Sequence, residues 1–186
     1  IRRLVDDKCL CDRANNGIVA SQSGPAIRIG VAKAQENPMT HITIRPRRSL
    51  LFVPGLRPDR FDKALDTGAD IVCVDIEDAV PLPRKQEARD LTLPLFANDA
   101  PAGVETMVRV NPLSTPDGLQ DILALRDCAA PPRALMLAKP GPAAEIKLYE
   151  ELLQGNCGGI RFHVIIESTD GLANVMEIAD ASDRID

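Results

Sequence analysis

The sequence contains no tryptophan and only five aromatic residues, four phenylalanines and one tyrosine, among its 186 residues. An apolar core must therefore be built mainly from leucine, isoleucine, valine and alanine. No stretch approaches the ~20 consecutive apolar residues that a transmembrane helix requires. The N-terminus also lacks the continuous apolar segment of a secretory signal. These absences argue against a membrane or secreted protein.

Positive charge and paired cysteines are also scarce. Lysine and arginine number 22 against 27 aspartates and glutamates, a formal net charge of -5. Phosphate binding needs a basic excess, so this balance argues against nucleic acid as a partner. The cysteines form an odd, scattered set with no second pair at zinc-binding spacing, which fits a reducing cytoplasm. They are Cys9, Cys11, Cys73, Cys128 and Cys157.

The two ends of the chain suggest that it is part of a longer protein. It begins with isoleucine and stops at ASDRID, without a helix cap or a polar tail. Residues 1–44 show no regular periodicity and contain the turn signals NNG, SQSG and ENP. We expect them to form an irregular extension that could be disordered, with a small unrecognised subdomain as the alternative.

Residues 45–186 alternate regularly between strand and helix patterns and form five strand–helix units. Their strands are apolar for most of their length, as parallel strands covered by helices should be. We expect strands at 49–55, 70–78, 106–111, 133–141 and 160–168, and helices at 57–68, 83–96, 115–127, 142–156 and 170–181.

Two α/β architectures fit five such units, an open doubly wound sheet and a (β/α) barrel. The doubly wound sheet should have a glycine-rich phosphate turn after its first strand, but the turn here is VPGLRP. This absence favours a TIM-type (β/α) barrel. The barrel is incomplete in this chain, because about five units are present where eight are needed.

The helix patterns carry local signals for their ends and buried faces. Thr115 followed by proline predicts an N-cap, and Pro94 should end or kink the helix at 83–96. In the helix at 115–127 we expect three residues to face inward, Leu119, Ile122 and Leu123.

Charged and amide side chains follow the apolar strands at the points where the strands end. Because the carboxyl ends of parallel strands meet at one edge, these groups should face a common mouth, where functional residues of both architectures lie. Carboxylates there can hold Mg²⁺, and the planar fork of an arginine suits a substrate carboxylate. The residues are Asp75, Glu77, Asp78, Arg109, Asn111, Lys139 and Glu167.

Each of these residues also has a structural interpretation. The three acids could form salt bridges with Arg109 or Lys139, Asn111 could shape a turn, and Lys139 could be an exposed loop residue. Arg109 and Glu167 lie within or directly after strongly apolar strands, which favours a functional role. His163 lies in mid-strand and is expected to be structural, whereas His41 belongs to the N-terminal extension.

Five segments together resemble the HpcH/HpaI aldolase and citrate lyase family, especially its thioester lyases. They are RSLLFVPG (48–55), DIVCVDIEDAVP (70–81), MVRVN (107–111), LMLAKP (135–140) and VIIESTDGL (164–172). The resemblance implies a TIM-type barrel, Mg²⁺ dependence and cleavage of a 3-hydroxyacyl thioester into an acetyl-type thioester and a 2-oxo acid. The substrate would be carried by CoA or an acyl carrier protein.

The resemblance also implies roles for particular residues. Arg109 would bind the substrate carboxylate, and Glu167 would bind both Mg²⁺ and substrate. Arg48 would line the same pocket, and the acidic pair Glu77 and Asp78 would lie on the rim near the metal. The second metal carboxylate is expected beyond residue 186, and no residue of this chain is assigned as the general base.

Three functions therefore remain open from the sequence. The leading one is a Mg²⁺-dependent thioester lyase, a homo-oligomer when full length, of which these 186 residues would be an inactive part. The second is an aldolase that acts on free 2-oxo acids. The third is a non-catalytic scaffold built on half a barrel, whose unpaired strand edges would favour association.

Overall fold

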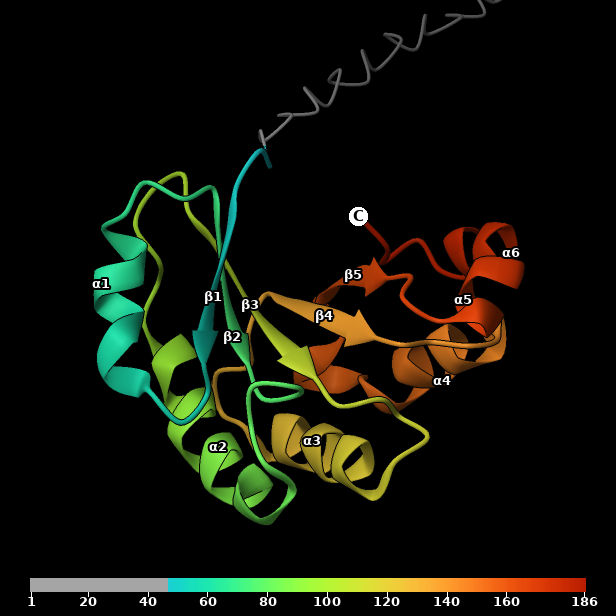
Figure 1. Cartoon of the computed structure of the whole chain (residues 1–186), viewed down its shortest axis with the longest axis horizontal. Coiled ribbons are helices and arrows are strands. Elements are labelled where there is room, and N and C mark those ends of the chain that lie inside the picture. The colour runs from blue at the N-terminus through green and yellow to red at the C-terminus, as the bar shows by residue number, and fades with distance from the viewer. Residues whose placement is uncertain (1–46) are drawn as a thin grey trace, which may run out of the picture. The chain divides into compact units, whose positions relative to one another are not determined.

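The computed structural model describes residues 47–186, which form one α/β unit around a five-stranded parallel sheet (Figure 1). The predicted extension at residues 1–44 lies outside the described residues, as do Cys9, Cys11 and His41. The strands are β1 (Leu50–Pro54), β2 (Ile71–Asp75), β3 (Glu105–Val110), β4 (Ala134–Ala138) and β5 (Arg161–Ile165).

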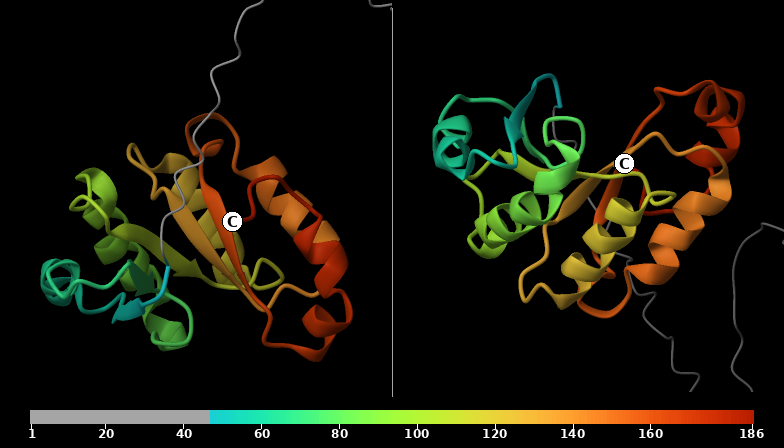
Figure 2. Two further views of the ribbon diagram at one scale, coloured as in Figure 1. Left: turned by 90° about the horizontal axis from the view of Figure 1, so that it is seen from above. Right: turned by 60° about the horizontal axis from the view of Figure 1, so that its bottom comes forward.

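The strands lie in the sheet in the same order as in the chain, β1-β2-β3-β4-β5, and every neighbouring pair is parallel. Right-handed crossovers in one direction place the connecting helices on one face of the sheet. A doubly wound sheet instead reverses its strand order at a switch point. The order therefore agrees with the barrel-type prediction, and Figure 2 shows the helices along the outer side of the strands.

The predicted strand–helix alternation is confirmed, although several helices are shorter than expected. Pro94 acts as predicted, because the second helix stops at Thr92 and continues only as a 3-10 turn, Leu93–Ala97. The predicted helix at 170–181 is divided at Asn174. The helices are α1 (Phe61–Leu65), α2 (Lys85–Thr92), α3 (Pro116–Asp127), α4 (Ala143–Leu152), α5 (Thr169–Ala173) and α6 (Val175–Ala179).

The two faces of the sheet bury different sets of side chains. The helix-covered face carries the larger core, in which Leu135 and Phe162 pack with Tyr149 of α4. The opposite, inner face carries a smaller cluster that contains Ile71, Cys73, Met107, Ala134 and Met136. Cys73 is fully buried there, as expected of a small core residue. Side chains alternate along each strand, so Asp75, at the end of β2, shares the inner face with Ile71 and Cys73.

Of the three residues of α3 predicted to face inward, only Ile122 does so, and the prediction is wrong for Leu119 and Leu123. Ile122 is buried, but Leu119 and Leu123 are 50% and 53% exposed. The helix buries positions 118, 121, 122 and 125 instead. Asp121 lies on the buried face because its carboxylate accepts hydrogen bonds from the backbone and side chain of Asn111. The buried face of α3 is therefore not the one that its leucines alone would indicate.

The segment that ends at Asp186 lies beside β5. Ile185 forms an isolated parallel bridge with Phe162, and the buried guanidinium of Arg184 donates hydrogen bonds to three backbone carbonyls. This segment covers part of the outer edge of β5. Within residues 47–186, no helix is long and apolar enough to cross a bilayer.

The cap of α3 gives a testable prediction about stability. The side-chain oxygen of Thr115 accepts a hydrogen bond of 3.0 Å from the backbone N–H of Gly118. Thr115→Ala should lower the free energy of unfolding by about 1 kcal/mol, as measured by urea denaturation, because a helix N–H loses its partner. Thr115→Ser keeps the hydroxyl and should stay near the parent value; equal losses in both variants would contradict the cap.

Candidate active site at the carboxyl edge of the sheet

The charged groups predicted to share one edge do lie at the carboxyl ends of their strands. Asp75 is the last residue of β2, and the strand register places it directly opposite Arg109 of β3. Lys139 follows β4, and Glu167 comes two residues after β5. The parallel orientation of the strands thus brings these groups to a single edge.

A bidentate ion pair joins Asp75 and Arg109 across β2 and β3. Arg109 donates from Nε to Oδ1 over 2.9 Å and from Nη2 to Oδ2 over 2.5 Å. The carboxylate also accepts from the backbone N–H groups of Glu77 and Ala79. The hydrogen bond to Asp75 raises the pKa of Arg109 above its ordinary value, against the opposing effect of burial. Both charged partners are therefore fixed in place.

A second group of charges surrounds Lys139. Its Nζ lies 2.5 Å from Oε1 of Glu77 and 3.1 Å from Oδ1 of Asp78. The hydrogen bond to Glu77 raises the pKa of Lys139, and the hydrogen bond from Lys139 lowers the pKa of Asp78. Lys139 has a φ of 55°, in the left-handed region that non-glycine residues rarely adopt. The salt bridges predicted between the three acids and Arg109 or Lys139 are therefore present.

Glu167 differs from the other acids at this edge. It is exposed, and within residues 47–186 its carboxylate forms no ion pair or side-chain hydrogen bond. The next residue, Ser168, caps α5 by accepting a hydrogen bond of 3.0 Å from the N–H of Gly171. A Cβ at position 171 would lie 2.7 Å from the carbonyl oxygen of Pro140, so this tight turn requires glycine. The ESTDG segment therefore fixes the backbone that carries Glu167.

A buried polar layer under the edge was missed by the sequence interpretation. Nζ of Lys85 donates to the carbonyl oxygens of Ile76 and Glu77 and to Oδ1 of Asn111. Asn111 is thus not a simple turn residue, because its amide group also donates to Asp121 over 2.8 Å. The layer holds the backbone of the Asp75–Ala79 loop from below.

Asp121 and Arg89 extend this layer toward the helices. Arg89 donates from Nη1 to Asp121 over 2.9 Å, and both side chains are buried. Burial raises the pKa of Asp121, although its hydrogen bonds to Asn111 and Arg89 oppose the shift. The available signal was the spacing of Lys85, Ala88 and Arg89, which puts two cations on the buried face of α2.

The structure does not bring Arg48 to the carboxyl edge, so the prediction that it lines the same pocket is wrong. Arg48 lies before β1, at the amino edge, where Nη2 donates to Oδ1 of Asp70 over 3.0 Å. Its side chain is 77% exposed. The side chain extends toward Asp70, the residue before β2, and does not extend along β1 toward the carboxyl edge.

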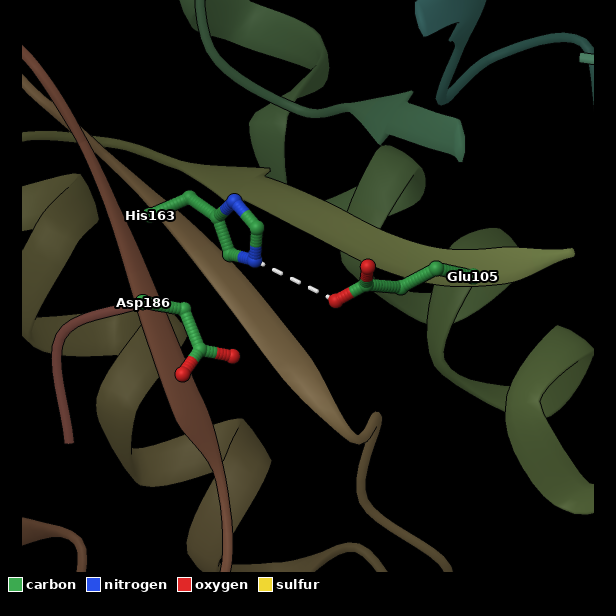
Figure 3. Close-up of side chains that lie close together, drawn as sticks. All are labelled: Glu105, His163 and Asp186. Atoms are coloured by element: carbon green, nitrogen blue, oxygen red, sulfur yellow. Dashed lines mark hydrogen bonds and ion pairs between the residues drawn. The ribbon is translucent and has the colours of Figure 1, made fainter. Parts of the chain in front are cut away.

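A separate polar cluster occupies the amino edge of the inner face (Figure 3). Nε2 of His163 lies 3.2 Å from Oε1 of Glu105, and Asp186 lies beside them. Arg47 pairs with both carboxylates, and Arg161 pairs with Asp186. Two cations thus balance the two acids, so the cluster is an ion-pair network. The structural role expected for His163 agrees with this arrangement.

A cavity of about 620 Å³ also lies at the amino edge, lined in part by Arg47, Glu105, Arg133 and Arg161. None of the carboxyl-edge residues lines it. This cavity is therefore separate from the candidate site at the carboxyl ends of the strands.

Comparison with known proteins identifies the family. The profile of the HpcH/HpaI aldolase/citrate lyase family matches residues 48–186. The chain belongs to this family. The match includes all five strands and every residue of the carboxyl edge described above. The family resemblance drawn from the five sequence segments is therefore confirmed.

Two curated relatives illustrate which members of the family are similar. L-malyl-CoA/beta-methylmalyl-CoA lyase of Cereibacter sphaeroides (strain ATCC 17025 / ATH 2.4.3) is 37% identical over 149 residues, which cover 76% of this chain and 46% of the relative. Citrate lyase subunit beta of Leuconostoc mesenteroides subsp. cremoris is 35% identical, with coverage of 76% and 48%. The chain thus spans less than half the length of these relatives.

Solved structures of the family share the fold. RipC from Yersinia pestis is 31% identical with a TM-score of 0.61, and the match covers 76% of this chain and 56% of that one. CitE from Mycobacterium tuberculosis, solved with magnesium and pyruvate, is 32% identical with a TM-score of 0.58, over 75% and 53% of the two chains.

The contacts of Lys139 predict how Asp78 titrates. Lys139→Gln should raise the pKa of Asp78 toward that of an unpaired aspartate, because the Lys139 hydrogen bond is the largest cause of its lowering. A carboxyl with a lowered folded pKa contributes stability above its ordinary pKa, and the contribution is lost as pH falls through the folded pKa. The variant should lose part of this dependence.

Carboxyl-carbon NMR shifts followed as a function of pH would measure this change. Arg84→Gln is the matched control, because Arg84 pairs with Glu87 and not with Asp78. An unchanged Asp78 titration in Lys139→Gln would show that the lysine does not hold this carboxylate.

Proposed function

We propose that the whole protein is a Mg²⁺-dependent carbon–carbon lyase. It would cleave a 3-hydroxyacyl thioester of the malyl or citryl type into an acetyl-type thioester and a 2-oxo acid, with CoA or an acyl carrier protein as the carrier. The similar malyl-CoA lyases and citrate lyase beta subunits support this reaction class. CitE, which has been solved with magnesium, acetoacetate and coenzyme A, supports the metal and a CoA-linked substrate.

The observation that carries the proposal is that a fixed arginine and a carboxylate without an ion-pair partner among the described residues lie at the same edge of the sheet. Arg109 is held by Asp75 through only two of its nitrogens. Glu167 is exposed at the same edge and makes no ion pair among the described residues. The guanidinium can bind the carboxylate of a 2-oxo acid, and the free carboxylate can bind the divalent cation that the same acid chelates.

The donor set at this edge fits a hard divalent cation. Glu167 supplies a carboxylate oxygen, and Mg²⁺ keeps several water molecules when few protein ligands are present. Glu77 and Asp78 are already paired with Lys139, so we place them near the metal and not among its direct ligands. When bound, the metal would polarise the oxygen of the forming ketone.

The residues of this chain would stabilise charge during cleavage. The carbon–carbon bond breaks, its electron pair remains on the thioester as an enolate, and the alcohol becomes a ketone as its proton passes to a base. Arg109 would hold the carboxylate next to the reacting carbon throughout. The buried Lys85–Asn111 layer would keep the Asp75–Ala79 loop in position beside it.

The proposal extends to the architecture of the whole protein. The five strands in chain order would form the first part of a TIM-type barrel, with the second metal carboxylate supplied from outside residues 1–186. Residues 1–186 alone would then be inactive. Within residues 47–186, β1 pairs with one strand only, and such an open strand edge supports a homo-oligomeric or associating state.

A substrate comparison tests the proposed reaction. The whole protein with Mg²⁺ should cleave malyl-CoA or citramalyl-CoA, measured by release of the 2-oxo acid, and EDTA should abolish turnover. Free hydroxy acids should be cleaved far more slowly. Turnover confined to free acids would favour the aldolase, and no turnover of either class would favour the scaffold. Robust cleavage by residues 1–186 alone would contradict their predicted inactivity.

The role of Glu167 has its own test. Mn²⁺ serves as a paramagnetic probe of the proposed Mg²⁺ site, and its binding can be followed by electron paramagnetic resonance. Glu167→Gln should weaken Mn²⁺ binding by at least about tenfold, because a charged oxygen ligand is replaced by a neutral one. Glu177→Gln on α6 is the matched control, since Glu177 is also exposed and lies on a nearby element. Equal affinity in the two variants would remove Glu167 from the metal site.

A further inference from the structure

The carboxylate of Asp75 is held more firmly than a simple salt bridge requires. It is only 2% exposed. Oδ1 accepts from the N–H of Glu77 at 2.9 Å and from Nε of Arg109 at 2.9 Å. Oδ2 accepts from the N–H of Ala79 at 3.1 Å and from Nη2 of Arg109. Each oxygen thus has one backbone donor and one guanidinium donor, so the carboxylate cannot rotate without breaking two bonds.

This geometry leaves a defined part of Arg109 available. Asp75 occupies the side of the guanidinium that carries Nε and Nη2. Within residues 47–186, Nη1 takes part in no hydrogen bond or ion pair. Nη1 and the second hydrogen of Nη2 form the other edge of the planar group, which matches a carboxylate in a bidentate manner.

Phe52 of β1 fixes the plane of the same guanidinium. Cζ of Arg109 lies 4.8 Å from the centre of the Phe52 ring, within the range of a cation–π contact. Phe52 is 42% exposed, much like Leu50 and Leu51 of the same edge strand at 38% and 37%. The contact with the Arg109 guanidinium, and not the exposure, is what points to a role for Phe52.

We propose that Asp75 and Phe52 are positioning residues that aim the Nη1/Nη2 edge of Arg109 at the carboxylate of a 2-oxo acid. This inference rests on the proposed function for the identity of the ligand. Asp75 fixes the guanidinium within its plane, and Phe52 fixes the plane itself. Neither residue touches the ligand. Their effect on binding must therefore pass through Arg109.

A double-mutant cycle tests this dependence. The measurement is the affinity of the whole protein for pyruvate in the presence of Mg²⁺, by isothermal titration calorimetry. Asp75→Asn should weaken binding about tenfold or more in the parent, but by less than twofold in an Arg109→Lys background, because lysine has no fork to aim. Equal losses in both backgrounds would show a general structural effect and overturn the proposal.

Asp70→Asn is the matched control for the loss of an aspartate–arginine ion pair at the other edge of the sheet. Asp70 accepts hydrogen bonds from Arg48 side-chain and backbone groups at the amino edge, away from Arg109. It should leave pyruvate affinity within twofold of the parent. If Asp70→Asn weakens binding as much as Asp75→Asn does, the effect of Asp75 is not specific to its contact with Arg109.

Phe52→Leu provides a second test if Asp75→Asn does not fold. It should weaken pyruvate binding about three- to fivefold, whereas Leu50→Ala, two residues earlier and similarly exposed, should not. No difference between these two variants would overturn the role of Phe52. Absence of pyruvate binding by the parent would overturn the whole inference.

The outcome is separable from the proposed lyase activity. If thioester cleavage is absent but pyruvate binding shows the Asp75–Arg109 coupling, the proposed function fails and the positioning role stands. If cleavage occurs but Asp75→Asn matches the Asp70→Asn control, the positioning role fails and the function stands.

Discussion

Five parallel strands that lie in chain order must all end at the same edge of the sheet, and the whole candidate site depends on this constraint. The register aligns Asp75 with Arg109, so an ion pair forms between two adjacent strand ends, and the loop after β2 supports it with two backbone N–H donors. Residues that are 34 positions apart in the chain become neighbours in this way. Glu167 reaches the same edge because β5 belongs to the same parallel set.

Charge at this edge is stabilised from below by a layer of buried polar groups. Lys85 binds the carbonyl oxygens of the loop that follows β2, and Asn111 links Lys85 to Asp121. A buried polar network of this kind is favourable only when its members are satisfied. Within residues 47–186, Thr92 Oγ1 is the one buried side-chain polar atom without a partner. Through this network, helix α2 holds the backbone of the loop that follows β2 in place.

The fold and the edge of the site could be predicted from the sequence, because apolar strand patterns and the charges after them are local signals. The position of the Arg48 side chain could not be predicted in this way. It forms an ion pair with Asp70, which precedes the neighbouring strand, and the sequence around Arg48 does not indicate this contact. Leu119 and Leu123 were misassigned because Asp121, a polar residue, takes the buried face of α3. The role of Lys85 required contacts with residues 8 and 26 positions away.

We propose that Arg109 and Glu167 together bind a 2-oxo acid and its metal ion at the carboxyl edge. A crystal structure of the whole protein with Mg²⁺ and a 2-oxo acid tests it most directly. We expect the ligand carboxylate on Nη1 and Nη2 of Arg109, and the metal bound to an oxygen of Glu167. A ligand found at the amino edge, beside Glu105 and His163, or a metal without Glu167 among its ligands, would contradict it.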